Sequence, residues 1–167
     1  YKRQGLDGIE KIIKEEGLIR AYKDGNDKEA RWNMMMASTE GAMAFSKGLG
    51  AVHSMSHAAG ANQKLNLHHG TLNAVILPTI LKFNHNHVGN KYSRIASAMG
   101  INESTNLADE ITKLNEMIGI PKGLAEMGIT EEMIPELVKH SITDPSNITT
   151  PRLPTEEEWE NLFLQCM

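Results

Sequence analysis

The sequence predicts an all-α fold, a multi-helix domain that spans residues 1–167. Apolar residues recur at three- and four-residue steps along most of the chain, which is the period of an amphipathic helix. No segment alternates polar and apolar residues, with β-branched side chains, for long enough to predict a strand. The composition, with ten methionines and only 5% aromatic residues, also favours packed helices over a β-sandwich.

The first helices follow from apolar spacing and from capping residues. Apolar positions within 6–22 predict one amphipathic helix, and Gly25 is its expected stop. A second helix is predicted over 27–46, with Asn26 as its N-terminal cap. That helix is apolar on nearly all sides, so we expect it to be buried at the centre of the domain. The glycines at 48–50 end it.

The middle of the chain predicts three more helices. A histidine-bearing helix follows the glycines and leads into a loop over 60–67. The next helix is predicted over 69–83 and contains Pro78. We expect a kink or a break there, because proline cannot donate to the carbonyl four residues earlier. A short helix over 92–99 comes next.

The last part of the chain is marked by caps. A clean apolar stripe predicts a helix over 107–118, with Ser104 as its cap. Thr130 and Thr155 are the expected caps of two further helices, and the segment 143–154 between those helices is irregular and rich in proline. The expected buried face of the last helix consists of Trp159, Leu162 and Phe163.

Bulk properties exclude several classes of protein. The net charge of −4, without a cluster of Lys and Arg, argues against a nucleic-acid partner. No apolar run approaches the ~20 residues that cross a bilayer, and the single cysteine, Cys166, excludes a disulfide framework. We therefore expect a cytoplasmic protein with no membrane partner. The chain starts on Tyr1, within a helical pattern, which is consistent with a fragment of a longer protein.

Histidines mark the segment most suited to chemistry. Four of the seven histidines lie in 48–84, which contains no acidic residue. His53 and His57 are four apart and share one face of a helix, while His68 and His69 follow the loop. A divalent ion needs three or four donors at ~2 Å. Either the helical pair or His53 with His69 supplies two, so a metal site here is incomplete.

The competing interpretation is structural. Buried histidines commonly donate to a backbone carbonyl and have no other role, and a stand-alone helical binding domain would use them in this way. Other chemistries are not indicated, because the chain has no GxSxG elbow, no Walker loop and no GxGxxG after a strand.

Two blocks of sequence resemble a known family. GLGAVHSMSHAAG at 48–60 and LHHGTLNAVILPTILKFN at 67–84 resemble the signature region of the iron-containing (group III) alcohol dehydrogenases. The similarity continues through ARWNMMMASTEGAMAFSKGLG upstream and TDPSNITTPRLPTEEEW downstream. In that family a nucleotide-binding α/β domain precedes an all-helical domain, and this chain resembles the second. The resemblance therefore implies the helical domain of the dehydroquinate synthase-like fold.

The resemblance also implies site residues. Family members hold the catalytic ion with an aspartate, a histidine four residues later and two further histidines, which here match His53 and His69. His68 stands where the family usually has proline, so it is the alternative to His69 as a ligand. His57 matches a histidine beside the metal and the nicotinamide, which implies proton handling and contact with the cofactor. Phe45 resembles an aromatic residue that lines the substrate pocket.

The implied activity is that of an NAD(P)-dependent, iron-containing alcohol dehydrogenase, which interconverts an alcohol and an aldehyde or ketone. The expected metal is Fe²⁺, with Zn²⁺ as the alternative, and NAD or NADP would be bound mainly by the domain absent from this chain. The Asp-x-x-x-His pair and the glycine-rich loop are also absent from these residues, so the fragment alone is expected to be inactive. A homo-oligomer, a dimer or larger, is expected. A glycerol dehydrogenase-like relative is the rival within the same architecture.

Overall fold

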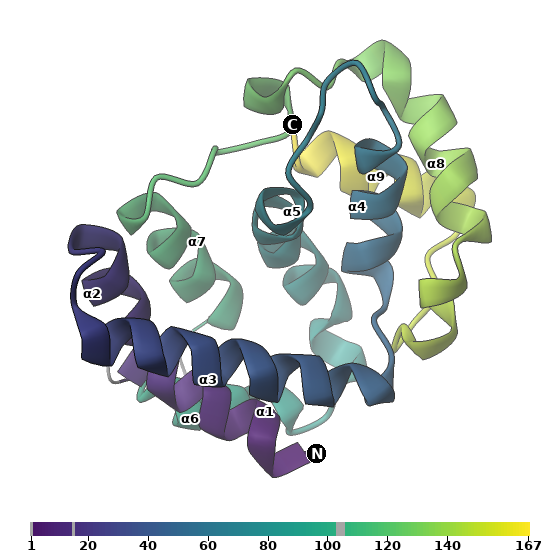
Figure 1. Cartoon of the computed structure of the whole chain (residues 1–167). Helices are drawn as coiled ribbons and strands as arrows, with labels where there is room; N and C mark the ends of the chain where they lie inside the picture. The colour runs from purple at the N-terminus through teal and green to yellow at the C-terminus, as the bar shows by residue number, and fades with distance from the viewer. Residues whose placement is uncertain (1, 15, 103–105) are drawn as a thin grey trace. The chain divides into compact units, whose positions relative to one another are not determined.

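The structure is a computed structural model of the chain and describes residues 2–14, 16–102 and 106–167. Every regular element among these residues is a helix, so the all-α prediction is confirmed (Figure 1). The chain divides into two compact units, Tyr1–Gly48 with Gly89–Leu107 and Leu49–Val88 with Ala108–Met167. The prediction of one domain over 1–167 stays a prediction. No helix in the described part of the chain is long and apolar enough to cross a bilayer.

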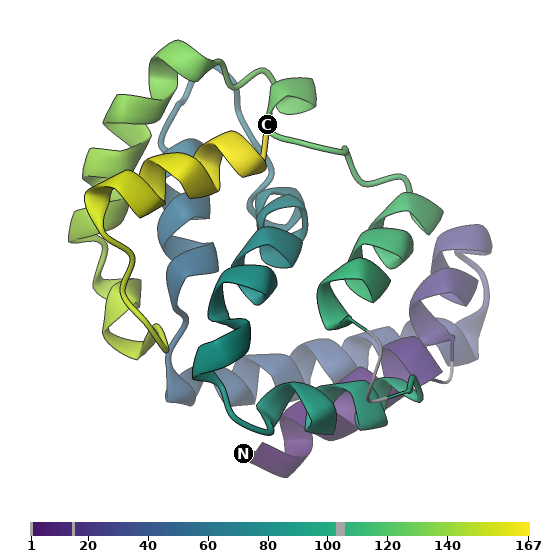
Figure 2. The same cartoon turned by 180° about the vertical axis from the view of Figure 1, so that it is seen from behind.

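The first unit is built on one long helix, α3, against which α1 and α2 pack (Figures 1 and 2). The last helix of this unit, α6, contacts α1. The elements of the unit are α1 (Lys2–Ile9), the π-helical turn η1 (Glu10–Lys14), α2 (Gly17–Lys23), α3 (Lys28–Ala44), the 3-10 turn η2 (Phe45–Lys47) and α6 (Lys91–Met99).

The prediction of one continuous helix over 6–22 is wrong. Glu16 takes a left-handed conformation with φ of 53°, and a new helix starts at Gly17. A Cβ atom added to Gly17 would lie 2.7 Å from the carbonyl oxygen of Lys11. The backbone therefore folds back on itself at a point where only glycine fits. Apolar spacing continues across this break, so spacing alone does not reveal it.

The start of α3 also differs from the prediction. The cap is Asp27 and not Asn26, because the side chain of Asp27 accepts a 3.0 Å hydrogen bond from the backbone N–H of Ala30. Arg20 donates to the same carboxylate from α2, at 2.9 Å. One aspartate therefore begins α3 and ties α2 to it.

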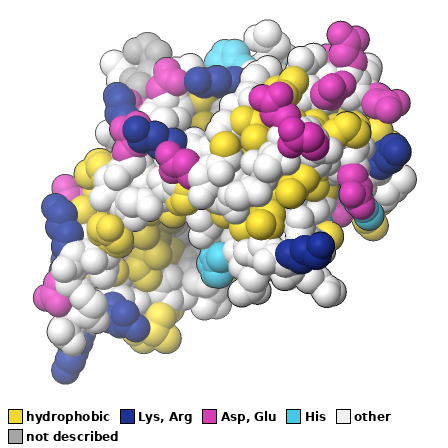
Figure 3. All heavy atoms as spheres, turned by 90° about the horizontal axis from the view of Figure 1, so that it is seen from above, with side chains coloured by type: hydrophobic (Ala, Val, Ile, Leu, Met, Phe, Trp, Pro, Cys, Tyr) yellow, Lys and Arg dark blue, Asp and Glu magenta, His cyan; other side chains and the backbone are white. Residues whose placement is uncertain are grey.

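The expected central burial of α3 is wrong as well. The helix buries only the small residues Ala30 and Ala37, and a Cβ atom on Gly8 of α1 would lie 3.4 Å from the carbonyl oxygen of Ala37. The two helices thus approach through small residues, and the large apolar side chains of α3 point elsewhere. Trp32 is 61% exposed and Met35 is 65% exposed. Apolar side chains lie among charged ones on the face drawn in Figure 3.

The second unit holds the larger core. In this unit α4 packs against α5 and α8, while α9 packs against α8 and contacts α5 (Figures 1 and 2). The centre of its core is formed by Met55, Leu72, Ile76, Leu124, Trp159 and Phe163. The elements are α4 (Ala51–Gly60), α5 (His69–Asn84), η3 (His85–His87), α7 (Leu107–Met117), η4 (Ala125–Met127), η5 (Glu131–Met133), α8 (Ile134–Thr143), η6 (Pro145–Thr149) and α9 (Glu156–Gln165).

The caps predicted for the last helices agree with the structure only in part. Thr155 forms a complete capping box with Glu158, which confirms that prediction, and the expected face of α9 is buried. Thr130 is the N-cap residue of the short turn η5, directly before α8, as predicted, but its side chain makes no cap bond. The predicted cap Ser104 lies outside the described residues.

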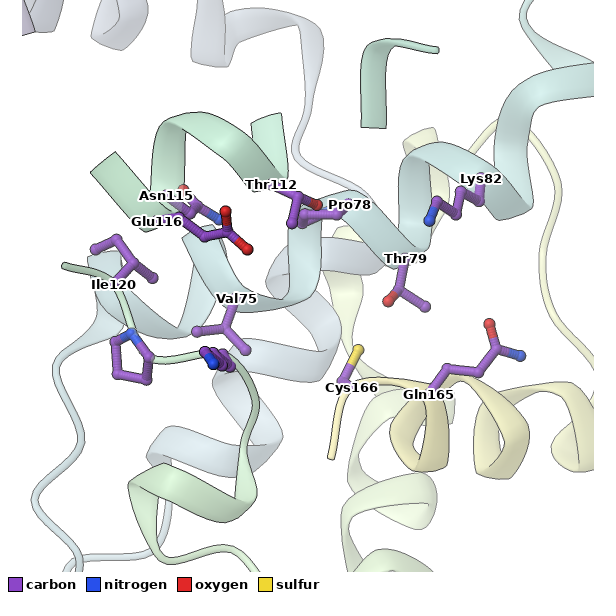
Figure 4. Close-up of a pocket in the computed structure, with 12 residues that line it drawn as sticks. Val75, Pro78, Thr79, Lys82, Thr112, Asn115, Glu116, Ile120, Gln165 and Cys166 are labelled. Carbon is purple, nitrogen blue, oxygen red and sulfur yellow. The ribbon is translucent and has the colours of Figure 1, made fainter. Parts of the chain in front are cut away.

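Helix α5 runs without a break through Pro78, so the expected break does not occur. Proline leaves the carbonyl of Ala74, four residues earlier, without its helical donor. The side chain of Asn115 on α7 donates to this oxygen at 2.7 Å, and Figure 4 shows Asn115 and Pro78 at the same pocket. A side chain distant in sequence therefore compensates for the proline.

Replacing Asn115 by leucine is expected to lower the free energy of unfolding by about 1–3 kcal/mol, because the Ala74 carbonyl loses its donor. Urea unfolding measures this loss. In a Pro78→Ala background the loss should shrink, since alanine supplies the missing N–H. An equal loss in both backgrounds would show that the Asn115 bond does not compensate for the proline.

Candidate metal centre

Three histidine rings meet where α4 and α5 lie side by side. Helix α4 starts directly after Gly50, whose φ of 108° suits glycine, and it carries His53 and His57 one turn apart. His69 is the first residue of α5. The ring centroid of His69 lies 5.3 Å from that of His53 and 5.3 Å from that of His57. The centroids of His53 and His57 are 5.7 Å apart. The structure thus brings these three predicted residues together.

His68 has a different place. Its Nδ1 accepts a hydrogen bond from the backbone N–H of Thr71 at 3.3 Å and lies 3.1 Å from the hydroxyl of the same residue. The side chain therefore caps the start of α5 and is turned toward the helix. Of the two adjacent candidates, His69 is the one that joins the ring cluster.

The Nε2 atoms of His53 and His69 face one common group. The amide nitrogen of Asn73 lies 3.1 Å from Nε2 of His69 and 3.5 Å from Nε2 of His53. An amide nitrogen can only donate, so each Nε2 atom presents a lone pair toward it. The amide oxygen of Asn73 is buried and has no hydrogen-bond partner among the described residues. Two convergent imidazole lone pairs beside an unpaired oxygen are suitable donors for a divalent transition metal.

The hydroxyl group of Ser56 supports the orientation of the His69 ring on its Nδ1 side. The hydroxyl oxygen of Ser56, a fully buried residue, lies 3.4 Å from Nδ1 of His69. The same hydroxyl donates to the carbonyl oxygen of His53 at 3.1 Å. It therefore acts as an acceptor for a proton on Nδ1, which leaves Nε2 free as a ligand atom.

The surroundings favour the neutral form of both rings. Desolvation by burial lowers the pKa of His53, and the neighbouring His69 and His57 lower it further. Desolvation also lowers the pKa of His69, together with His57 and His68. A neutral imidazole is the form that binds a metal ion. Because both rings are already neutral in a larger share of molecules, a metal ion has to displace fewer protons when it binds near pH 7.

These pKa shifts predict how the stability of the metal-free protein depends on pH. Because the folded-state pKa of His53 lies below its ordinary value of 6.5, the unfolded chain binds the proton more readily. The free energy of unfolding should therefore fall as the pH drops through 6.5 toward the lower folded value. Urea unfolding at about pH 7.5 and about pH 5.5 measures the slope.

The variant His53→Gln should make that slope smaller, since it removes one of the two histidines whose pKa is lowered. His140→Gln is the matched control, because His140 is exposed on α8 outside the cluster. An unchanged slope in His53→Gln would contradict the assignment.

The cluster is open and incomplete. His57 and His69 are exposed, and His53 is half-buried, so further ligands have access to the site. Among the residues that the structure describes, no group of three or more His, Cys, Asp or Glu side chains could hold a metal ion. The described residues therefore offer two ligands and not a closed site.

His57 has an acidic partner that the sequence pattern does not reveal. Nδ1 of His57 lies 2.9 Å from a carboxylate oxygen of Asp144, which precedes η6. Burial opposes ionisation of Asp144, but hydrogen bonds from Ser146 and His57 outweigh it and lower the pKa of the carboxyl group. The only signal in the sequence is an Asp-Pro-Ser segment, which predicts a turn and not its neighbour in space.

A pocket of the second unit, about 280 Å³ in volume, lies between α5, α7 and the end of α9 (Figure 4). None of the cluster histidines lines it. The thiol of Cys166 does, but burial raises the pKa of this group to about 11, so the thiol is not an activated nucleophile.

Phe45 belongs to the first unit. It forms the C-terminal cap of α3 and the start of η2, and it is 59% exposed. Its assignment to the substrate pocket stays a prediction.

Comparison with known proteins gives a family match over nearly the whole chain. The family described as Fe-containing alcohol dehydrogenase, C-terminal, matches residues 6–167. The chain is 37% identical over 169 residues to 4-hydroxybutyrate dehydrogenase of Cupriavidus necator, covering 97% of this chain and 44% of that protein. It is also 37% identical over 152 residues to NAD-dependent methanol dehydrogenase of Bacillus methanolicus, covering 86% of this chain and 39% of that protein.

A solved structure agrees with these relatives. The crystal structure of a 1,3-propanediol oxidoreductase superposes with a TM-score of 0.91 and 30% identity, over 99% of this chain and 44% of that one. The fold predicted from the resemblance is therefore confirmed. The chain spans less than half the length of these relatives.

Proposed function

We propose, since this chain belongs to the iron-containing alcohol dehydrogenase family and matches its C-terminal domain, that it is the metal-binding part of an NAD(P)-dependent alcohol dehydrogenase. Such an enzyme interconverts an alcohol and an aldehyde or ketone. The observation that carries the proposal is the convergence of Nε2 of His53 and Nε2 of His69 on one amide group. The two Nε2 atoms therefore lie near one common point, as two ligands of one ion must.

His53 and His69 are the proposed ligands from this chain, for Fe²⁺ or alternatively Zn²⁺. The remaining ligands, an aspartate and a histidine, would be residues of the full-length protein that lie outside this chain. When bound, the ion would supply Lewis-acid stabilisation of negative charge on the substrate oxygen, and NAD(P) would supply the hydride acceptor. The exposed position of His69 suits a site completed from a second domain.

His57 is the proposed proton acceptor. Its side chain is 42% exposed, and its ring stacks on that of His69, with an interplanar angle of 16°. The ring can therefore take the proton of the substrate hydroxyl and pass it to solvent water, with the O–H bond broken and an N–H bond formed. Phe45 is proposed to line the substrate pocket.

The substrate is proposed to be a small alcohol. The names of the three relatives refer to 4-hydroxybutyrate, methanol and 1,3-propanediol, and each of these compounds carries a primary hydroxyl group. A homo-oligomer and a cytoplasmic location stay predictions.

The test uses the full-length protein after removal of metal with a chelator. Formation of NADH or NADPH from a panel of small primary alcohols and glycerol should disappear with the metal and return on addition of Fe²⁺ or Zn²⁺. Glycerol as the preferred substrate would favour the glycerol dehydrogenase-like rival. No turnover of any alcohol with either metal and either cofactor would refute the proposal.

A further inference from the structure

The hydrogen bond between His57 and Asp144 determines which ring nitrogen carries the proton. Nδ1 of His57 lies 2.9 Å from Oδ2 of Asp144. An ionised carboxylate can only accept, so the hydrogen atom of the neutral ring is on Nδ1 and the lone pair is on Nε2. Without this acceptor the two tautomers of an exposed imidazole would both be populated.

Asp144 is itself held in place. Its other oxygen, Oδ1, accepts a 2.7 Å hydrogen bond from the backbone N–H of Ser146. The side chain of Asp144 is only 14% exposed, against 42% for His57. The carboxylate is therefore a fixed group against Nδ1 of the ring, while a large part of the His57 side chain is exposed.

The turn that carries Asp144 is fastened to both neighbouring helices through Asn147. The amide nitrogen of Asn147 donates to the carbonyl oxygen of Ser141 on α8 at 2.7 Å, and its amide oxygen accepts from the hydroxyl of Ser54 on α4 at 2.7 Å. Ser54 is fully buried and precedes His57 by one turn of the same helix. These bonds fix the distance between the carboxylate and the imidazole.

We infer that Asp144 is a positioning residue, which holds the His57 ring with Nδ1 turned to the protein and the Nε2 lone pair available to the substrate. This inference rests on the proposed function, in which His57 takes the substrate proton. Asn147 supports the same arrangement, because it fastens the turn on which Asp144 lies. Asp144 acts through His57 and does not itself touch the substrate.

The test compares Asp144→Asn with wild type in the full-length, metal-loaded enzyme. The ¹⁵N NMR shifts of labelled histidine, with His57 assigned from a His57→Gln sample, should show a proton on Nδ1 in wild type and loss of this preference in Asp144→Asn. The kcat should fall by about 10²-fold or more, while KM and metal content change by less than about 3-fold, since ligands and substrate contacts remain.

Two further variants sharpen the comparison. Glu136→Gln is the matched control, because Glu136 lies 3.9 Å from His140, outside the ring cluster, and it should leave all readouts unchanged. Asp144→Ser keeps an acceptor for the backbone N–H of Ser146 but is too short to reach His57. It should therefore show the same loss of tautomer preference and of kcat that is expected for Asp144→Asn. It can replace Asp144→Asn if that variant does not fold.

The inference is overturned if the His57 tautomer and kcat in both Asp144 variants stay those of wild type. It is also overturned if kcat falls only in proportion to bound metal, which would indicate a structural role. If wild type turns over no alcohol, the proposed function fails, and the NMR comparison still decides whether Asp144 sets the His57 tautomer. Loss of the tautomer preference without a loss of kcat in an active enzyme would overturn the positioning role.

Discussion

Replacing His69 by alanine is expected to abolish tight metal binding and to lower kcat/KM for alcohol oxidation by at least about 10³-fold. One of the two imidazole lone pairs that converge beside Asn73 is lost, and the remaining ligands no longer hold the ion during turnover. Bound metal is measured by elemental analysis of the full-length protein after gel filtration, and the rate by the absorbance of NADH or NADPH.

The neighbouring residue gives the matched control. His68→Ala removes an adjacent imidazole that caps α5, and it should cost only the stability of a helix cap, about 1 kcal/mol, with full metal content. The opposite pattern, loss of metal in His68→Ala and retention in His69→Ala, would make His68 the ligand. If both variants keep the full metal content and the full rate, neither His68 nor His69 is a metal ligand.

Replacing His57 by glutamine is expected to lower kcat by about 10²- to 10⁴-fold while the bound metal is retained. Glutamine keeps a polar side chain but cannot accept the substrate proton. The rate at saturating alcohol, together with the metal content of the same sample, separates the two roles.

His140→Gln on α8 is the control for the His57 variant and should turn over at the wild-type rate. Loss of metal together with rate in His57→Gln would instead identify His57 as a ligand. A wild-type kcat would show that the proton leaves by another route.

Much of the fold could be predicted, because local signals and tertiary contacts agree there. The capping box at Thr155 and the apolar face of α9 use bonds and spacings within a single turn or two, so the sequence contains them in full. The same holds for α6, where the predicted 92–99 nearly equals the observed helix Lys91–Met99.

The failures in the fold come from contacts that apolar spacing does not encode. The first helix breaks before Gly17, where the backbone of Lys11 lies close, and α5 continues through Pro78 because Asn115 replaces the missing donor. The exposure of Trp32 depends on which side of α3 its neighbours cover. Neither hydrophobic period nor composition contains that information.

The residues of the candidate site also fall into those that local spacing predicts and those that only the fold brings together. The spacing of His53 and His57 places both on one face of a helix from sequence alone, and resemblance to the family adds His69. Spacing cannot distinguish His69 from its neighbour, since only the cap at the start of α5 separates their orientations. Asp144 lies 87 residues from His57 in the chain, and its turn is brought back to α4 only by the fold.

We propose that His53 and His69 hold one metal ion together. A crystal structure of the full-length protein grown with Fe²⁺, with anomalous diffraction collected at the iron edge, tests this directly. We expect one anomalous peak at about 2.0–2.2 Å from Nε2 of both His53 and His69, the distance expected for an imidazole bound to a divalent transition metal. A peak bound to other residues, with the two Nε2 atoms still facing Asn73, would contradict it.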